Sequence, residues 1–73
     1  MHDEAVRWLT ALRGEFMIER NSKGHPMAVV VRVERALGGV VSRRADVLPG
    51  FSDELAERQA FTRACDELRR ALM

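Results

Sequence analysis

The feature that most constrains this chain is residues 27–35, where four valines stand between a turn-forming segment and a Gly-Gly pair. Val29, Val31 and Val33 alternate with other residues, as side chains do along a strand. Val30 interrupts this alternation, so both faces of the first half of the segment are apolar, which is typical of a central strand. The pattern predicts a strand with a neighbour on each side.

Two flanking segments can supply these neighbours. Residues 15–20 alternate polar and apolar side chains, with Phe16 on the apolar side. Residues 40–47 form a shorter and more polar strand candidate. Residues 21–26 and residues 38–39 are rich in glycine, asparagine, serine and proline, which is the composition of tight turns. We therefore expect three strands joined by two short turns.

Helical periodicity marks both ends of the chain. Residues 3–13 place apolar side chains at helical spacing, with Asp3 as the expected N-cap, Trp8 as a core anchor and Gly14 as the expected stop. A longer helix is expected after Ser52, a fitting N-cap that acidic side chains follow, where the helix dipole favours them. The apolar stripe of this second helix comprises Ala60, Phe61, Ala64, Cys65, Leu68, Ala71 and Leu72.

These elements predict an α+β fold in a single domain over residues 1–73. Two amphipathic helices and a small antiparallel sheet form a two-layer sandwich in the order helix–strand–strand–strand–helix, with both helices on one face of the sheet. The other face of the sheet must then meet water or a partner.

The basic side chains gather in the middle of the chain. Residues 20–44 carry six basic side chains and one acidic one, although the net charge of the whole chain is only +1. If the alternating valines face the helices, Arg32 lies on the open face of the sheet, where arginines of the third strand join it. Arginine binds phosphates and also pairs with carboxylates on acidic proteins. The candidate binding residues are Lys23, Gly24, His25, Arg32, Arg35, Arg43 and Arg44.

Patterns typical of catalysis and of metal binding are missing from the sequence. One cysteine and two distant histidines do not provide the three or four ligands of a metal site. Cys65 falls in the apolar stripe of the second helix, where it is expected to act as a small hydrophobic residue. His25 lies in a turn, with no partner in the sequence that would orient it for acid–base chemistry. We expect neither an enzyme nor a site for a metal, cofactor or small molecule.

The composition also bears on location. No apolar run approaches the roughly 20 residues that a membrane-spanning helix needs. The first residues are acidic and unlike a secretory signal, and a lone cysteine suits a reducing compartment. The sequence predicts a cytoplasmic protein without a membrane partner.

The order of the predicted elements resembles that of the double-stranded-RNA-binding domain. Residues 3–25, DEAVRWLTALRGEFMIERNSKGH, are similar to the small messenger-RNA-cleaving toxins of the HicA type, which share this topology and carry a Gly-Ser-His loop. The resemblance aligns Gly24 and His25 with that loop and implies that His25 is the catalytic histidine. This loop lacks the serine before the histidine, and the last helix opens with Ser-Asp-Glu rather than with the lysines that grip phosphates.

Three functions follow from these observations. The first is a non-catalytic binding module, as in a bacterial or phage accessory protein, that docks on a larger protein complex through the arginine-bearing sheet face. The second is an RNA-binding protein or a His25-dependent nuclease, although the second and third strands offer no aromatic side chain for base stacking. The third is a structural homodimer that buries Val30 and Val41. A protein partner or a second copy is favoured over nucleic acid.

Overall fold

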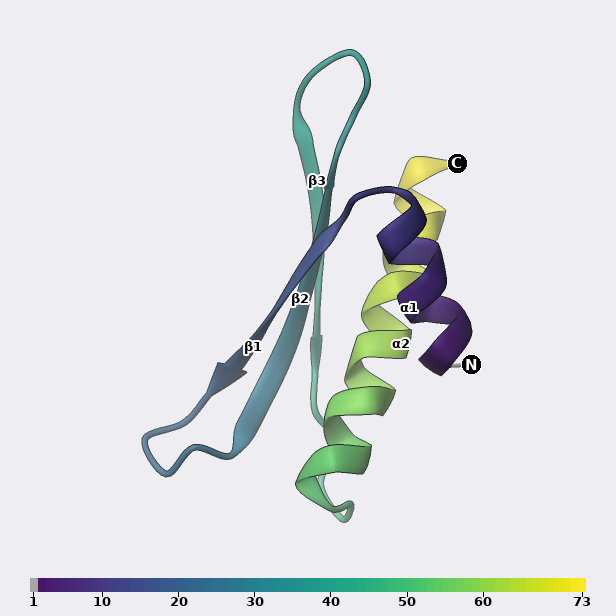
Figure 1. The fold of residues 1–73 in the computed structure, drawn as a ribbon. Coiled ribbons are helices and arrows are strands. Elements are labelled where there is room, and N and C mark those ends of the chain that lie inside the picture. The colour runs from purple at the N-terminus through teal and green to yellow at the C-terminus, as the bar shows by residue number, and fades with distance from the viewer. Residues whose placement is uncertain (1) are drawn as a thin grey trace.

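A computed structural model describes residues 2–73 and is shown in Figure 1. Helix α1 spans His2–Ala11 and helix α2 spans Asp53–Leu72. The strands between them are β1 (Glu15–Arg20), β2 (Pro26–Glu34) and β3 (Val40–Asp46). The predicted order of elements is confirmed.

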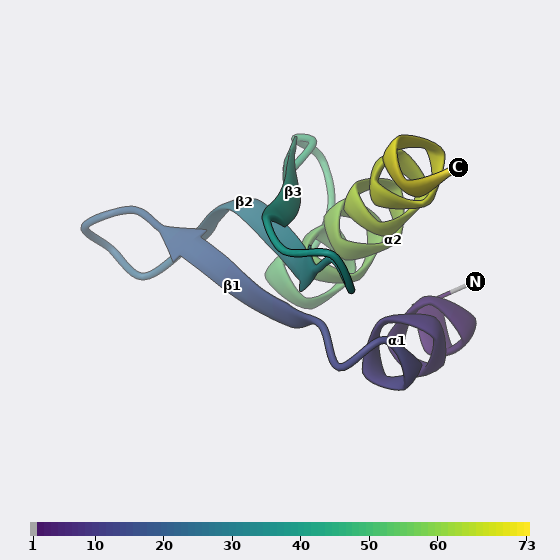
Figure 2. The same cartoon turned by 90° about the horizontal axis from the view of Figure 1, so that it is seen from above.

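The three strands form one antiparallel sheet in the order β1-β2-β3, so β2 is the central strand, as predicted. The register places Phe16 opposite Val31 and Val29 opposite Ala45. Figures 1 and 2 show both helices on the same side of the sheet. The α+β two-layer architecture is therefore confirmed, and one face of the sheet remains uncovered by helices.

The core lies between the central strand and the long helix. Val29, Val31 and Val33 point to the helix side and are almost fully buried, and α2 packs against β2 and β3. Burying a valine or leucine side chain contributes about 1.5–3 kcal/mol each, so this layer is the main source of stability. The helix contributes mostly small side chains, which let its backbone approach the sheet: Ala60, Phe61, Ala64, Cys65 and Leu68 are all buried.

The first helix ends differently from the sequence prediction. Arg13, not Gly14, adopts the left-handed conformation, with φ 56°. The backbone N–H of Gly14 donates to the carbonyl of Leu9 over 2.9 Å, and that of Arg13 donates to Thr10 over 2.9 Å, which is a Schellman cap. Glycine is needed at position 14 for space instead, because a Cβ there would lie 2.3 Å from Leu9 Cδ1.

Contacts between charged and aromatic side chains hold α1 against α2. The guanidinium of Arg69 lies 4.6 Å from the ring centroid of Trp8, a cation–π distance. Arg69 also donates to both carboxylate oxygens of Glu4. Trp8 is therefore a half-buried anchor that packs against the core from its edge rather than from within it.

Candidate functional site

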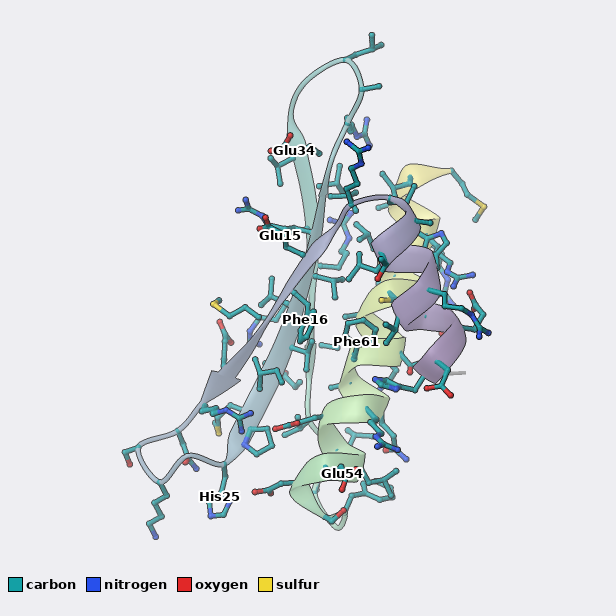
Figure 3. The ribbon with its side chains drawn as sticks, viewed as in Figure 1. Glu15, Phe16, His25, Glu34, Glu54 and Phe61 are labelled. Carbon is teal, nitrogen blue, oxygen red and sulfur yellow. The ribbon has the colours of Figure 1, made fainter. Side chains whose placement is uncertain are left out.

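The uncovered side of the sheet, which we name the open face, is the first candidate surface. Figure 3 shows Glu15 and Glu34 on this side, while Phe16 points to Phe61 on the helix side. Because paired residues of neighbouring strands share a face, the register defines the whole surface. The open face comprises Glu15, Met17, Glu19, Ala28, Val30, Arg32, Glu34, Val40, Ser42, Arg44 and Asp46.

The charge of the open face differs from the predicted one. Four of its side chains are carboxylates and only two are arginines. Arg32 Nε lies 3.2 Å from Glu15 Oε2, its direct partner across the β1–β2 pair. Arg44 Nε donates to Glu19 Oε1 over 2.8 Å. Both arginines are thus present on this face as predicted, but each is paired, and the face carries a net negative charge.

Arg44 makes the most extensive of these contacts. A second bond from its Nη1 reaches Asp46 Oδ1 at 2.5 Å. The hydrogen bond to Glu19 and the charge of Asp46 raise the pKa of the Arg44 guanidinium above its ordinary value. The Arg44–Glu19 bond runs from β3 to β1 across the central strand. Ala28 of β2 lies between Glu19 and Asp46 in the register and is fully buried.

Apolar side chains line a depression of about 390 Å³ on the open face. Met17 and Val30 are direct partners at the middle of the β1–β2 pair, and Val40 lies at the start of β3. The depression is also lined by polar side chains, Glu15, Arg32 and Ser42. The exposed fractions of Met17 and Val40 are 58% and 54%, which is high for such side chains. Uncovered apolar side chains surrounded by ion pairs are the composition of a protein–protein interface.

The other predicted arginines lie elsewhere. Arg43 is paired with Val31 in the register, so it belongs to the helix side of β3, and it donates to its neighbouring Ser42 carbonyl over 2.6 Å. Arg35 follows β2 and donates to the Ala71 carbonyl near the end of α2 over 3.4 Å. The alternation of strand side chains separates Arg43 from Arg44, so these two neighbours in sequence cannot act on one surface.

The loop between β1 and β2 holds the remaining predicted residues at the opposite end of the sheet from Arg35 (Figure 1). Asn21 Oδ1 accepts from the backbone N–H groups of Lys23 and His25, at 2.9 and 3.0 Å. Gly24 has φ 84°, a conformation that costs other residues about 1 kcal/mol or more. The loop is therefore a closed turn that fixes the direction of His25.

His25 has an orienting partner that the sequence did not reveal. Its Nδ1 lies 2.7 Å from Asp53 Oδ2, at the start of α2, where Ser52 Oγ caps the helix by accepting from the Leu55 N–H over 3.3 Å. Both side chains of the pair are more than half exposed, so water reaches them freely. The pair has the connectivity of a general base and its orienting group, without a water-excluding pocket.

Within residues 2–73, no group of three or more His, Cys, Asp or Glu side chains is arranged to hold a metal ion. Cys65 is completely buried, and burial raises the pKa of its thiol to about 11. No helix in the same residues is long and apolar enough to cross a bilayer.

The chain matches no protein-family model, and neither the curated proteins nor the solved structures contain a match to it.

Proposed function

We propose that this protein is a non-catalytic binding module that docks on a larger protein through the open face. The observation that carries the proposal is the apolar patch of Met17, Val30 and Val40, in which Met17 and Val40 are more than half exposed. Burying the exposed half of Met17 and of Val40 would contribute about half of the roughly 1.5–3 kcal/mol that full burial of such a side chain gives. The lone cysteine favours a cytoplasmic setting, in which the module serves as an accessory protein of a bacterium or phage.

The charges around the patch favour protein over nucleic acid as the partner. A phosphate bound to Arg32 or Arg44 would have to displace Glu15 or Glu19 and then lie next to the displaced carboxylate. A partner with lysine or arginine around an apolar patch instead meets a surface of opposite net charge, which speeds and orients association. The docking surface of the partner is therefore expected to be basic at its rim.

Photo-crosslinking tests this proposal. A benzophenone amino acid replaces Val40 on the open face in one variant and Leu48, which is similarly exposed but lies after β3, in a control variant. We expect the Val40 variant to form a covalent adduct with one protein in the cells that make it, and the Leu48 variant to form none. Adducts with nucleic acid, or equal adducts from both positions, would overturn the proposal.

A second candidate function is cleavage of RNA by His25, and the His25–Asp53 contact is the observation that favours it. The resemblance of residues 3–25 to the HicA-type toxins points the same way. Asp53 and Glu54 at the start of α2 count against it, because carboxylates there repel a phosphate. A loss of RNA cleavage and of growth toxicity in His25→Ala, with an intact fold, would establish this function; the absence of cleavage by the native protein would exclude it.

A homodimer through the sheet is the third candidate. Val30 lies on the open face, but Val41 is paired with Val33 and packs against the core on the helix side. The two valines named in the sequence prediction therefore do not share a surface, and Val40 takes the place of Val41. Sedimentation over the micromolar range tests this candidate, since a dimer through the patch would dissociate on dilution.

A further inference from the structure

The hydrogen bonds of the central strand show which way the backbone groups of β2 point. The N–H of Val47 donates to the Met27 carbonyl over 3.0 Å, and the N–H of Arg35 donates to the Gly39 carbonyl over 2.9 Å. Successive residues of an antiparallel strand point their backbone groups to opposite sides. The odd-numbered residues of β2 therefore bond to β3, and its even-numbered residues bond to β1.

This alternation shows which backbone groups of β1, one of the two edge strands, are free to bond outside the sheet. Glu15, Met17 and Glu19 are the register partners of even-numbered residues of β2, so their N–H and C=O groups point into the sheet. Phe16 and Ile18 point their N–H and C=O groups outward from the edge. A strand from another chain can pair with these outward groups without disturbing any bond of the existing sheet.

The helix side of this edge is apolar and uncovered. The Phe16 ring packs edge-on against Phe61, with centroids 5.3 Å apart, yet 58% of Phe16 remains exposed. Beside it, a cleft of about 300 Å³ runs between β1 and the two helices. Val6 and Ile18 contribute to its apolar wall, and it is also lined by charged side chains of α2: Glu54, Glu57 and Arg58. Figure 2 shows α2 next to β2 and β3, while β1 extends away from it. An apolar side chain of an added strand would enter this cleft.

The other side of the same edge is acidic. Glu15 and Glu19 are the acidic β1 residues of the open face, and each already pairs with an arginine of the central or the far strand. The four carboxylates of the face still outnumber its two arginines, and 70% of the Glu15 side chain remains exposed to a further basic group. Side chains of an added strand alternate between the two sides of the sheet, so those on the open-face side would lie beside Glu15, Met17 and Glu19. Lysine or arginine is the matching side chain there.

We propose that the β1 edge binds an extended segment of the partner protein in which apolar and basic side chains alternate. This inference rests on the proposed protein-binding function and specifies the chemistry of the partner. The segment would add a fourth strand to the sheet, with backbone bonds to Phe16 and Ile18, apolar side chains in the cleft and basic side chains over Glu15 and Glu19.

A second copy of this chain fits the edge less well. Pairing β1 with its own copy around Met17, with the helices of both copies on one side, places Glu15 opposite Glu19 of the other copy at both ends. Pairing around Ile18 uses Arg20, where the register of the strand shifts. The charges therefore favour a basic segment from another protein over self-association.

Amide hydrogen exchange measured by NMR tests the inference with a synthetic peptide as the probe. The peptide alternates lysine and valine over seven residues, and the comparison peptide has glutamate in place of each lysine. At a peptide concentration of about ten times the dissociation constant, the Phe16 and Ile18 amides should exchange about tenfold more slowly, since exchange occurs only from the free state. The glutamate peptide should leave both rates unchanged.

Three results would overturn the inference. Unchanged exchange at Phe16 and Ile18 with millimolar lysine–valine peptide excludes the edge as its site. Equal slowing by the glutamate peptide excludes the role of the carboxylates. Slowing that rises with protein concentration in the absence of peptide identifies a second copy as the occupant.

Two substitutions at Phe16 separate the contribution of its backbone N–H to peptide binding from that of its side chain. Phe16→Pro and Phe16→Ala both remove the ring, but only proline removes the outward N–H, which no bond of the sheet uses. Circular dichroism checks that both variants fold. We expect the peptide to slow exchange of the Ile18 amide in Phe16→Ala and not in Phe16→Pro; equal behaviour of the two variants would overturn the inference.

The same variants distinguish this inference from the proposed function. If the crosslinked partner binds Phe16→Pro as tightly as Phe16→Ala and is lost when a charge enters the open face at Val40, the module binds protein but not through its edge. If no protein partner depends on either position, both proposals fail.

Discussion

Arg44 Nε donates to Glu19 Oε1 over 2.8 Å, joining β3 to β1, the two outer strands of the sheet. This bond crosses the central strand and engages an arginine that the sequence indicates as a candidate binding residue for either a phosphate or an acidic protein. Together with the Arg32–Glu15 pair, it places both arginines of the open face in ion pairs, and the four carboxylates of that face give it a net negative charge. The functional proposal depends on this charge.

The first prediction is that releasing these arginines creates affinity for nucleic acid. The native protein should bind duplex RNA weakly or not at all. The double variant Glu15→Gln/Glu19→Gln removes two carboxylates from the open face, which leaves Arg32 without its carboxylate partner and Arg44 paired with Asp46 alone. Its affinity in fluorescence anisotropy should rise and should fall steeply with salt, because each phosphate contact releases counterions.

A matched control separates this local effect from net charge. Asp66→Asn/Glu67→Gln changes the net charge by the same amount but removes exposed carboxylates of α2, one of which is paired with Arg70. We expect the control to bind RNA no better than the native protein. Equal gains in the two double variants would show that the arrangement of the open face does not govern binding.

The second prediction concerns Cys65, which is completely buried between the helix and the sheet. At pH 8 its thiol should resist a disulfide reagent in the folded protein and react at once after unfolding. Burial raises the pKa of the thiol from 9.0 to about 11, so the neutral thiol stabilises the fold fully below about pH 9. This contribution is lost as the pH rises through about 11.

Urea unfolding at several pH values measures the effect. Between pH 9 and pH 11 the free energy of unfolding should fall more steeply for the native protein than for Cys65→Ala, which has no thiol to ionise. Parallel curves for the two proteins would contradict the prediction.

The third prediction concerns the contact between Glu4 and Arg69. The hydrogen bond from Arg69 lowers the pKa of Glu4 below its ordinary value of 4.5. A lowered folded-state pKa gives stability that is present above pH 4.5 and is lost as the pH falls through the folded-state value. Trp8, the single tryptophan, lies against Arg69 and reports on this region.

Acid titration followed by tryptophan fluorescence tests this contact. The native protein should show a transition below pH 4.5 that Glu4→Gln lacks, while Glu67→Gln, which removes an exposed carboxylate paired within α2, should retain it. If the transition persisted in Glu4→Gln, it would have to come from groups other than Glu4, which would contradict the prediction.

The fourth prediction concerns the space at Gly14. A Cβ at this position would lie 2.3 Å from Leu9 Cδ1 and 2.8 Å from Val33 Cγ1. Gly14→Ala should therefore lower the free energy of unfolding by about 1–3 kcal/mol, the usual cost of overpacking a core. Adding Val33→Ala removes one of the clashing groups, so Gly14→Ala should cost less in that background; equal costs in both backgrounds would contradict the packing argument.

Much of the fold could be predicted from the sequence because its periodicities are clear. The valines of β2, the stripe of α2 and the turn residues each favour one local structure, and all of them agree on a two-layer arrangement. The end of α1 was predicted less well. A glycine after a helix usually indicates that the glycine adopts the left-handed conformation, but here Arg13 adopts it and Gly14 is required only because a Cβ would not fit.

The candidate site was harder to predict because it depends on strand register. The alternation in residues 15–20 already places Glu15 and Glu19 opposite to Phe16, and hence on the open face. Predicting that these carboxylates pair with Arg32 and Arg44 requires the register of both strand pairs, β1–β2 and β2–β3. His25 and Asp53 are 28 residues apart in the sequence, so no local pattern predicts their contact.

Affinity capture from the cells that make the protein, with two charged variants compared, tests whether the open face is the docking surface. Val40→Lys places a charge at the edge of the apolar patch, and Leu48→Lys places the same charge at a similarly exposed leucine outside the open face. The account predicts one protein partner, resistant to nuclease treatment, that Leu48→Lys retains and Val40→Lys binds at least about tenfold more weakly, a loss of about 1.4 kcal/mol. Equal retention by both variants, or a partner that nuclease releases, would contradict it.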